Sequence, residues 1–189
     1  MSDGPLFWYL NRATGIVLLV LLTASVVLGV LSLGGRPGKG LPRFVSQAMH
    51  RNIALLSVAM LLAHVTTAVV DEYVDIRWWQ ALVPVGATYE PLWLGLGTLS
   101  LDLIAAVTIT SLLRSRMSHG SWRTIHLLSW LAWASAAAHS VGIGTDLRSP
   151  SGLGVVPVLV CLAAVLLALA VRLAQRLRPT DAPSWERSR

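Results

Sequence analysis

Five stretches of mostly apolar residues, each long enough to cross a membrane, constrain the fold of this chain more than any motif does. They lie at about 14 to 33, 45 to 70, 92 to 113, 125 to 143 and 154 to 173. A helix needs about 20 apolar residues to cross the hydrocarbon core of a bilayer. Hydrophobic residues make up 54% of the chain and charged residues 13%, which is rare in a soluble domain. The sequence therefore predicts an all-α integral membrane protein, a bundle of five transmembrane helices.

The same segments account for nearly the whole chain, so we predict one membrane domain over residues 1–176. Glycine and proline residues at 34–42 separate the first two segments. Residues 177–189 contain prolines and alternating charges, and we expect a disordered cytoplasmic tail there.

The distribution of lysine and arginine predicts the orientation of the bundle. Cytoplasmic loops of membrane proteins carry an excess of these residues. The expected connections on one side carry twelve basic residues and those on the other carry three, so we expect the N-terminus outside and the C-terminus in the cytoplasm. The basic residues lie beside apolar segments and not along one helical face, so we expect no nucleic-acid partner. The three on the external side are Arg12, Arg77 and Arg148.

Four of the five histidines lie inside two apolar segments, His50 and His64 in the second, His126 and His139 in the fourth. An ionisable side chain in hydrocarbon is costly, so each is a candidate functional residue. We expect both segments to run from the cytoplasmic side to the external side. His50 and His126 would then lie near the cytoplasmic face, and His64 and His139 would lie near the external face. The histidines of one helix are about 20 Å apart, too far to share a metal ion. The pattern suits two stacked haems, each bound by two histidines.

The spacing within each pair predicts a local irregularity in the fourth segment. His50 and His64 are fourteen residues apart and share a helical face at about 100° per residue. His126 and His139 are thirteen apart and differ by about 140° on an ideal helix. We therefore expect either a π or 3₁₀ distortion between them or haems approached from different flanks. The single cysteine, Cys161, rules out the CxxCH signature of covalent attachment, so each haem would be haem b.

Several other residues are weaker candidates. Arg51 and Arg123, with Trp122, lie near the expected inner haem, and Arg12, with Tyr9 and Asn11, near the outer one. Arginine can pair with haem propionates there, although snorkelling or interfacial anchoring is the competing role. Asp102 lies mid-membrane and could orient a ligand histidine or form an ordinary hydrogen bond as a neutral acid. Trp78, Trp79 and Trp93 fit an interfacial aromatic belt.

Two stretches resemble the ligand helices of the ferric reductase-like transmembrane domain family, which ferric reductases and NADPH oxidases share. These are HRNIALLSVAMLLAH, from His50 to His64, and HLLSWLAWASAAAH, from His126 to His139. The spacings match that family, and so does Arg51, directly after the first ligand. YLNRATG, from Tyr9 to Gly15, resembles the opening of bacterial members. The resemblance extends from about Trp8 to Leu173 and implies a bundle that carries two b haems and passes electrons across the membrane.

The expected electron donor is a separate molecule. NADPH oxidases and many ferric reductases continue into a cytoplasmic flavin and nicotinamide module, whereas this sequence contains no GxGxxG and ends soon after its last apolar segment. A flavoprotein docking on the basic inner face is one expected donor. Membrane quinol is another, implied by resemblance to the haem-binding membrane subunit of bacterial methionine sulfoxide reductase systems. Ferric iron or an extracytoplasmic redox protein is the expected acceptor.

We therefore predict a lipid-embedded, di-haem b-type cytochrome of the plasma membrane, an oxidoreductase component with no catalytic side chain of its own. Two alternatives stay open at this point. One is a single-haem membrane anchor subunit of an extracytoplasmic reductase. The other is a haem-binding sensor or carrier with no redox turnover.

Overall fold

The computed structural model describes residues 6–32, 42–71, 74, 76–143 and 155–177. Within these residues the regular secondary structure is all helical, with six α-helices and two short 3₁₀ helices. The elements in order are α1 (Leu6–Ser32), α2 (Arg43–Val70), η1 (Trp78–Ala81), α3 (Pro91–Leu112), η2 (Arg114–Arg116), α4 (His119–Leu127), α5 (Ser129–Ile143) and α6 (Val156–Leu177).

Four of the described helices are long and apolar enough to cross a membrane: α1, α2, α3 and α6. They correspond to the first, second, third and fifth apolar segments of the sequence, and the membrane character predicted from composition is therefore confirmed. Helix α1 begins at Leu6, eight residues before the expected position 14, because the stretch of polar and apolar residues that precedes the apolar segment is part of the same helix. Helix α6 ends at Leu177, and the rest of the predicted tail lies outside the described residues.

The fourth apolar segment differs from the single helix predicted at 125 to 143. It is divided into α4 and α5, and the helical structure begins earlier, at His119. The N–H of Leu128 donates to the carbonyl of Ile125 over 3.0 Å, which is the i to i−3 bond of a 3₁₀ turn. The predicted 3₁₀ distortion is thus present, two residues after His126. A 3₁₀ turn advances about 120° per residue, which offsets part of the phase difference between His126 and His139.

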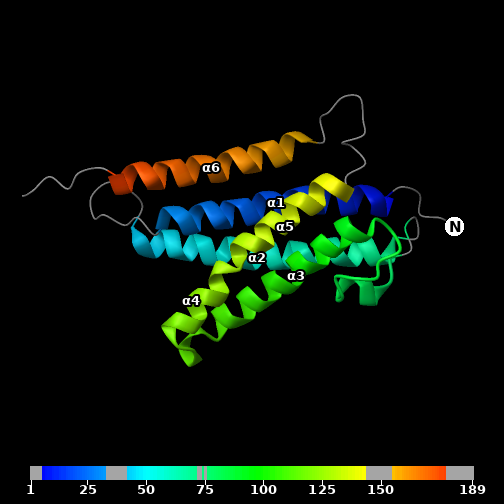
Figure 1. Ribbon diagram of the computed structural model, residues 1–189, viewed down its shortest axis with the longest axis horizontal. Coiled ribbons are helices and arrows are strands. Elements are labelled where there is room, and N and C mark those ends of the chain that lie inside the picture. Colours follow the sequence, from blue (N-terminus) through cyan, green and yellow to red (C-terminus); the bar gives the residue numbers. More distant parts are fainter. Residues whose placement is uncertain (1–5, 33–41, 72–73, 75, 144–154, 178–189) are drawn as a thin grey trace, which may run out of the picture.

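The helices pack in two groups, with α1, α2 and α6 in one and α3, α4 and α5 in the other (Figure 1). Helix α1 packs closely along α2 and also against α6 and α5, while α3 packs against α5 and α4. No comparably close packing joins α2 to α4 or α5. Helices α1, α3 and α6 begin at one end of the bundle, whereas α2 and α4 begin at the other. The two histidine-bearing segments therefore run in the same direction.

Buried polar contacts and a small apolar cluster hold the groups together. Trp133 Nε1 of α5 donates to Thr23 Oγ1 of α1 over 2.9 Å, and Ser100 Oγ of α3 donates to the carbonyl of Ala132 in α5 over 2.9 Å. Each bond satisfies a polar group that would be costly to leave unpaired away from water. The apolar cluster joins α1, α5 and α6 and consists of Leu19, Ala137, Val158 and Cys161.

The connection before α3 folds back over the start of that helix. Thr98 Oγ1 donates to the carbonyl of Gln80 in η1 over 2.8 Å, and Gln80 is itself buried. Gly95 lies directly beneath the carbonyl of Pro84, so that any larger residue at 95 would collide with backbone. This connection therefore fixes the end of α3 that carries Trp93 and Gly97.

Candidate functional site

The four histidines of the second and fourth apolar segments come together as two pairs, each with one residue from α2 and one from the divided fourth segment. The ring centroids of His50 and His126 are 6.2 Å apart, and those of His64 and His139 are 6.4 Å apart. The rings of the first pair are inclined at 65° and those of the second at 85°. The pairs lie toward opposite ends of the bundle, because α2 and the fourth segment run in the same direction.

The separation within each pair is the one that a metal between two imidazoles requires. Metal to imidazole nitrogen bonds are about 2.0 Å long, and the ring centroid lies roughly 1 Å beyond the nitrogen, so the centroids should be about 6 Å apart. Two imidazoles are too few to hold a bare ion, which takes four or more ligands. Among the described residues, no group of three or more His, Cys, Asp or Glu gathers around either pair. The arrangement is typical of two axial ligands.

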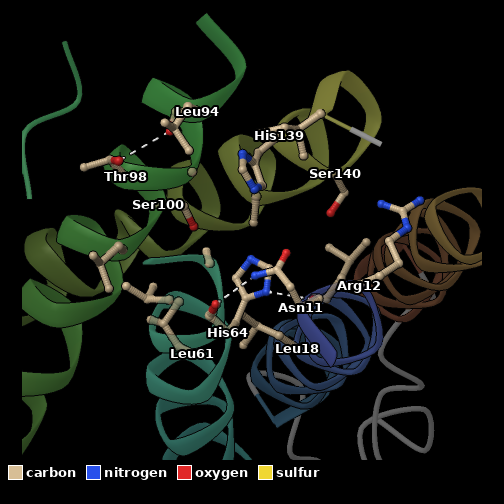
Figure 2. A pocket seen from close by; sticks show the side chains of 18 of the residues that line it. Asn11, Arg12, Leu18, Leu61, His64, Leu94, Thr98, Ser100, His139 and Ser140 are labelled. Atoms are coloured by element: carbon tan, nitrogen blue, oxygen red, sulfur yellow. Dashed lines mark hydrogen bonds between the residues drawn. The ribbon is translucent and has the colours of Figure 1, made fainter. Parts of the chain in front are cut away.

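A cavity of about 210 Å³ lies beside the His64/His139 pair. Figure 2 shows His64 and His139 facing each other from α2 and α5, with Asn11 and Arg12 of α1 at the side. All the α-helices except α4 contribute to its walls, and small residues such as Gly15 and Gly97 are among them. His50 and His126 do not line this cavity.

Three of the four histidines are oriented in the same way, by a main-chain carbonyl of a neighbouring helix. His50 Nδ1 lies 3.0 Å from the carbonyl oxygen of Ser25, His64 Nδ1 lies 3.1 Å from that of Asn11, and His139 Nδ1 lies 2.7 Å from that of Trp93. A carbonyl oxygen only accepts, so Nδ1 carries the proton in each ring. The lone pair is then on Nε2, the nitrogen left to bind a metal.

Each of these carbonyls is followed four residues later by a glycine that makes room for the ring. Gly15 follows Asn11 and faces His64, while Gly29 follows Ser25 and faces His50. Gly97 follows Trp93 and faces His139. A Cβ atom on Gly97 would lie only 2.6 Å from His139 Nδ1, and one on Gly15 would lie 3.0 Å from His64 Cε1. On α1 the two glycines are fourteen residues apart, the same spacing as the histidines they face on the antiparallel α2.

His126 departs from this arrangement. Its Nδ1 is buried and has no hydrogen-bond partner among the described residues. The ring stacks instead on Trp122, with centroids 4.9 Å apart and planes inclined at 25°. The guanidinium of Arg114 lies 4.3 Å from the centroid of the Trp122 ring. His126 is therefore positioned by stacking, and the other three by a directed hydrogen bond.

The remaining candidates from the sequence fall into different places. Arg12 lines the cavity of the His64/His139 pair. Arg51 and Arg123 are exposed. Arg51 directly follows His50, and Arg123 lies three residues before His126. Asp102 is half-buried on α3, and no hydrogen bond joins it to any of the four histidines in the described part of the chain. The sequence made Asp102 a candidate for orienting a ligand histidine. For His50, His64 and His139, main-chain carbonyls have this role instead.

Two contributors to the site, Asn11 and Trp93, have roles that differ from those the sequence reasoning gave them. Asn11 binds α1 to α2, since its Nδ2 donates to the carbonyl of His64 over 3.0 Å and to Thr67 Oγ1 over 3.3 Å. Trp93, assigned to an aromatic belt, supplies the carbonyl for His139, and its ring lies directly against Gly142. One signal was present in the sequence: Gly15 and Gly29 repeat the fourteen-residue spacing of the histidines.

No family model matches this chain, and no curated protein or solved structure is significantly similar to it.

The residues of both pairs fit the group that two axial imidazoles would hold, an iron porphyrin. The ring separations leave room for one iron between each pair, and three of the four rings have the tautomer that coordination needs. The four further ligand atoms that an iron would need would come from the porphyrin itself. The cavity beside His64 and His139 gives a flat ring a place to lie at that pair.

Proposed function

We propose that this protein is a di-haem b-type membrane cytochrome, similar to the ferric reductase-like family, that carries electrons across the membrane. The observation that carries the proposal is the separation of the ring centroids in the two pairs, 6.2 and 6.4 Å. Both values match the distance expected across a bis-histidine iron. The histidine spacings within the resembling stretches support the same conclusion.

In this proposal His50 and His126 hold the inner haem, and His64 and His139 hold the outer one. The haems supply reversible one-electron chemistry. The carbonyls of Ser25, Asn11 and Trp93 hold three imidazoles in the coordinating tautomer, which raises ligand basicity and lowers the reduction potential. Because His50, His126, His64 and His139 would all be engaged in holding the haems, the protein would favour electron transfer over reaction at the metal.

Charged groups near the two pairs fit the carboxylates of haem propionates. Arg12 lines the cavity of His64 and His139, where its guanidinium would pair with a propionate of the outer haem. Arg51 and Arg123 lie along the helices that carry His50 and His126 and are proposed to serve the inner haem in the same way. We propose the plasma membrane as the location, with the N-terminus outside.

The donor and the acceptor belong to the same proposal. A separate cytoplasmic flavoprotein, attracted by the basic inner face, or membrane quinol would reduce the inner haem. Ferric iron or an extracytoplasmic redox protein would oxidise the outer one. The chain would thus be the membrane component of an oxidoreductase, with the reacting partners supplied by other molecules.

One observation favours a second candidate, a membrane anchor that holds a single haem. The cavity of about 210 Å³ is lined by His64 and His139 but not by His50 or His126. A single haem would then lie between His64 and His139. The number of haems bound per chain separates the two candidates, because the anchor would bind one haem and the conduit two.

The test is the haem content and the reduced-minus-oxidised spectrum of the purified protein and of four variants, His50→Ala, His64→Ala, His126→Ala and His139→Ala. We expect two haems per chain in the parent. The losses should fall into two groups. His50→Ala and His126→Ala should each lose one haem, and His64→Ala and His139→Ala should each lose the other. A parent that binds no haem, or losses grouped by helix instead of by pair, would overturn the proposal. His119→Ala is the matched control, since His119 is exposed and belongs to neither pair.

A further inference from the structure

The four proposed haem ligands are not equally held, and His126 is the exception. His50, His64 and His139 each donate from Nδ1 to a main-chain carbonyl. The corresponding nitrogen of His126 is buried without a partner among the described residues. Its ring is held by stacking on Trp122, which has less directional preference than a hydrogen bond and permits the ring to turn in its plane.

The backbone that carries His126 is also less firmly packed than the backbone that carries His139. Helix α4 has nine residues, and none of them is buried. It ends one residue after His126, at the 3₁₀ turn of Leu128. Helix α5, in contrast, packs closely on α3 and has four buried residues: Ala132, Trp133, Ser135 and Ala137. A short exposed helix next to a break can shift or rotate at a lower cost than a helix anchored in the core.

Both differences weaken the attachment of His126 to a metal. A hydrogen bond from Nδ1 to a carbonyl makes Nε2 a better donor to the metal and fixes the orientation of the ring. His126 lacks that bond, while its counterpart His50 has it. Within this pair, His126 is therefore the side from which an axial ligand leaves more readily.

We propose, on the basis of the haem function above, that His126 is an exchangeable axial ligand and that a small neutral molecule of the carbon monoxide or nitric oxide class takes its place. In the exchange the bond between iron and His126 Nε2 breaks, and one bond between iron and the incoming molecule forms. No electron or proton is transferred. The His64/His139 pair, with both rings bonded to carbonyls, does not exchange.

The test uses carbon monoxide added to the fully reduced protein, followed by its absorption spectrum. We expect one carbon monoxide per chain, at half of the bound haem. The double variant His64→Ala/His139→Ala, which keeps the His50/His126 pair, should still bind it. The double variant His50→Ala/His126→Ala, which keeps the other pair, should not.

A second variant addresses the stacking contact without removing a ligand. Trp122→Leu should speed carbon monoxide binding by about five- to tenfold, because the ring of His126 loses its aromatic neighbour. Trp78→Leu is the matched control, since Trp78 is exposed in η1 and touches neither pair, and its rate should equal the parent's.

The outcomes separate this inference from the function on which it rests. A parent that holds two haems but binds no carbon monoxide, binds it equally at both, or binds it only through the His64/His139 pair overturns the role of His126 and leaves the cytochrome in place. An unchanged rate in Trp122→Leu also counts against it. A parent without haem overturns the proposed function itself.

Discussion

The most specific feature at the scale of single residues is the repeated combination of a carbonyl with a glycine four residues later. Within an α-helix the carbonyl of residue i lies under the side chain of residue i+4, because Cα–Cβ bonds tilt toward the N-terminus. A glycine at i+4 uncovers that carbonyl for a ring from another helix. Asn11 with Gly15, Ser25 with Gly29 and Trp93 with Gly97 all follow this rule.

Gly97→Ala should disrupt the His139 side of the site. Its Cβ would lie 2.6 Å from His139 Nδ1 and 2.7 Å from Cε1, so the ring has to leave its position. Overpacking of this kind costs about 1 to 3 kcal/mol, and we expect about half of the bound haem to be lost. Haem content per chain and the reduced spectrum measure the effect.

Gly29→Ala is the matched control for that substitution. A Cβ at 29 would meet only His50 Cε1, at the ordinary contact distance of 3.7 Å. Its haem content should equal the parent's. Full haem content in Gly97→Ala would mean that the ring of His139 tolerates displacement, and the carbonyl and glycine pairing would then not position it.

The histidines could be predicted from the sequence, whereas their carbonyl partners could not. A histidine in an apolar segment is easily recognised in the sequence. The distribution of lysine and arginine predicts the orientation of that segment, and thus the membrane face that the histidine lies near. The partners of His64 and His139 are backbone atoms of Asn11 and Trp93, which no side-chain pattern reports. Which helix lies against α2 depends on packing of the whole bundle. Only the fourteen-residue repeat of Gly15 and Gly29 was available as a local signal.

At the scale of helices, the break at Leu128 agrees with the distortion that the thirteen-residue spacing of His126 and His139 predicts. The spacing predicts a distortion but not its position, since a π or 3₁₀ turn anywhere between the two histidines changes their relative phase. The structure has it at Leu128, through the bond to Ile125. The cause is local hydrogen bonding that apolar periodicity does not encode.

Inserting one alanine between Leu127 and Leu128 should affect the haem site of α4, at His126, without affecting that of α5, at His139. An additional helical residue rotates α4 by about 100° relative to α5 and moves it by about 1.5 Å, so His126 no longer faces His50. We expect the loss of the haem of that pair and retention of the other. The haem content per chain and the reduced-minus-oxidised spectrum measure this loss. Loss of both haems, or retention of both, would contradict the role of the break.

Trp133 and Thr23 should contribute more to stability than to haem binding. Thr23→Val removes the acceptor of the buried Trp133 Nε1, and an unsatisfied buried donor costs about 1 to 3 kcal/mol. The thermal unfolding temperature should fall, with haem content per folded chain unchanged. Thr110→Val is the control, because Thr110 Oγ1 bonds only to carbonyls of its own helix, so its unfolding temperature should move little. An equal fall in both variants would argue against a bond that links the helices.

At the scale of the whole molecule, the two histidine pairs can occupy opposite membrane depths only if the bundle is threaded through the bilayer. Helix α3 is the critical element, because it separates the connection that carries Thr88 from η2, which carries Ser115. The basic residues of η2, Arg114 and Arg116, belong to the side predicted to be cytoplasmic. Opposite locations of these two segments would therefore establish both the crossing and its direction.

Cysteine labelling with a membrane-impermeant thiol reagent tests this arrangement. The one native cysteine, Cys161, is 3% exposed, so the parent chain should stay unlabelled and serves as the control. Thr88 and Ser115 are exposed positions. We expect Thr88→Cys to label in intact cells and Ser115→Cys to label only after permeabilisation. The reverse pattern would invert the orientation and exchange the inner and outer pairs, while labelling of both from one side would show that α3 does not cross and that the pairs do not lie at opposite faces.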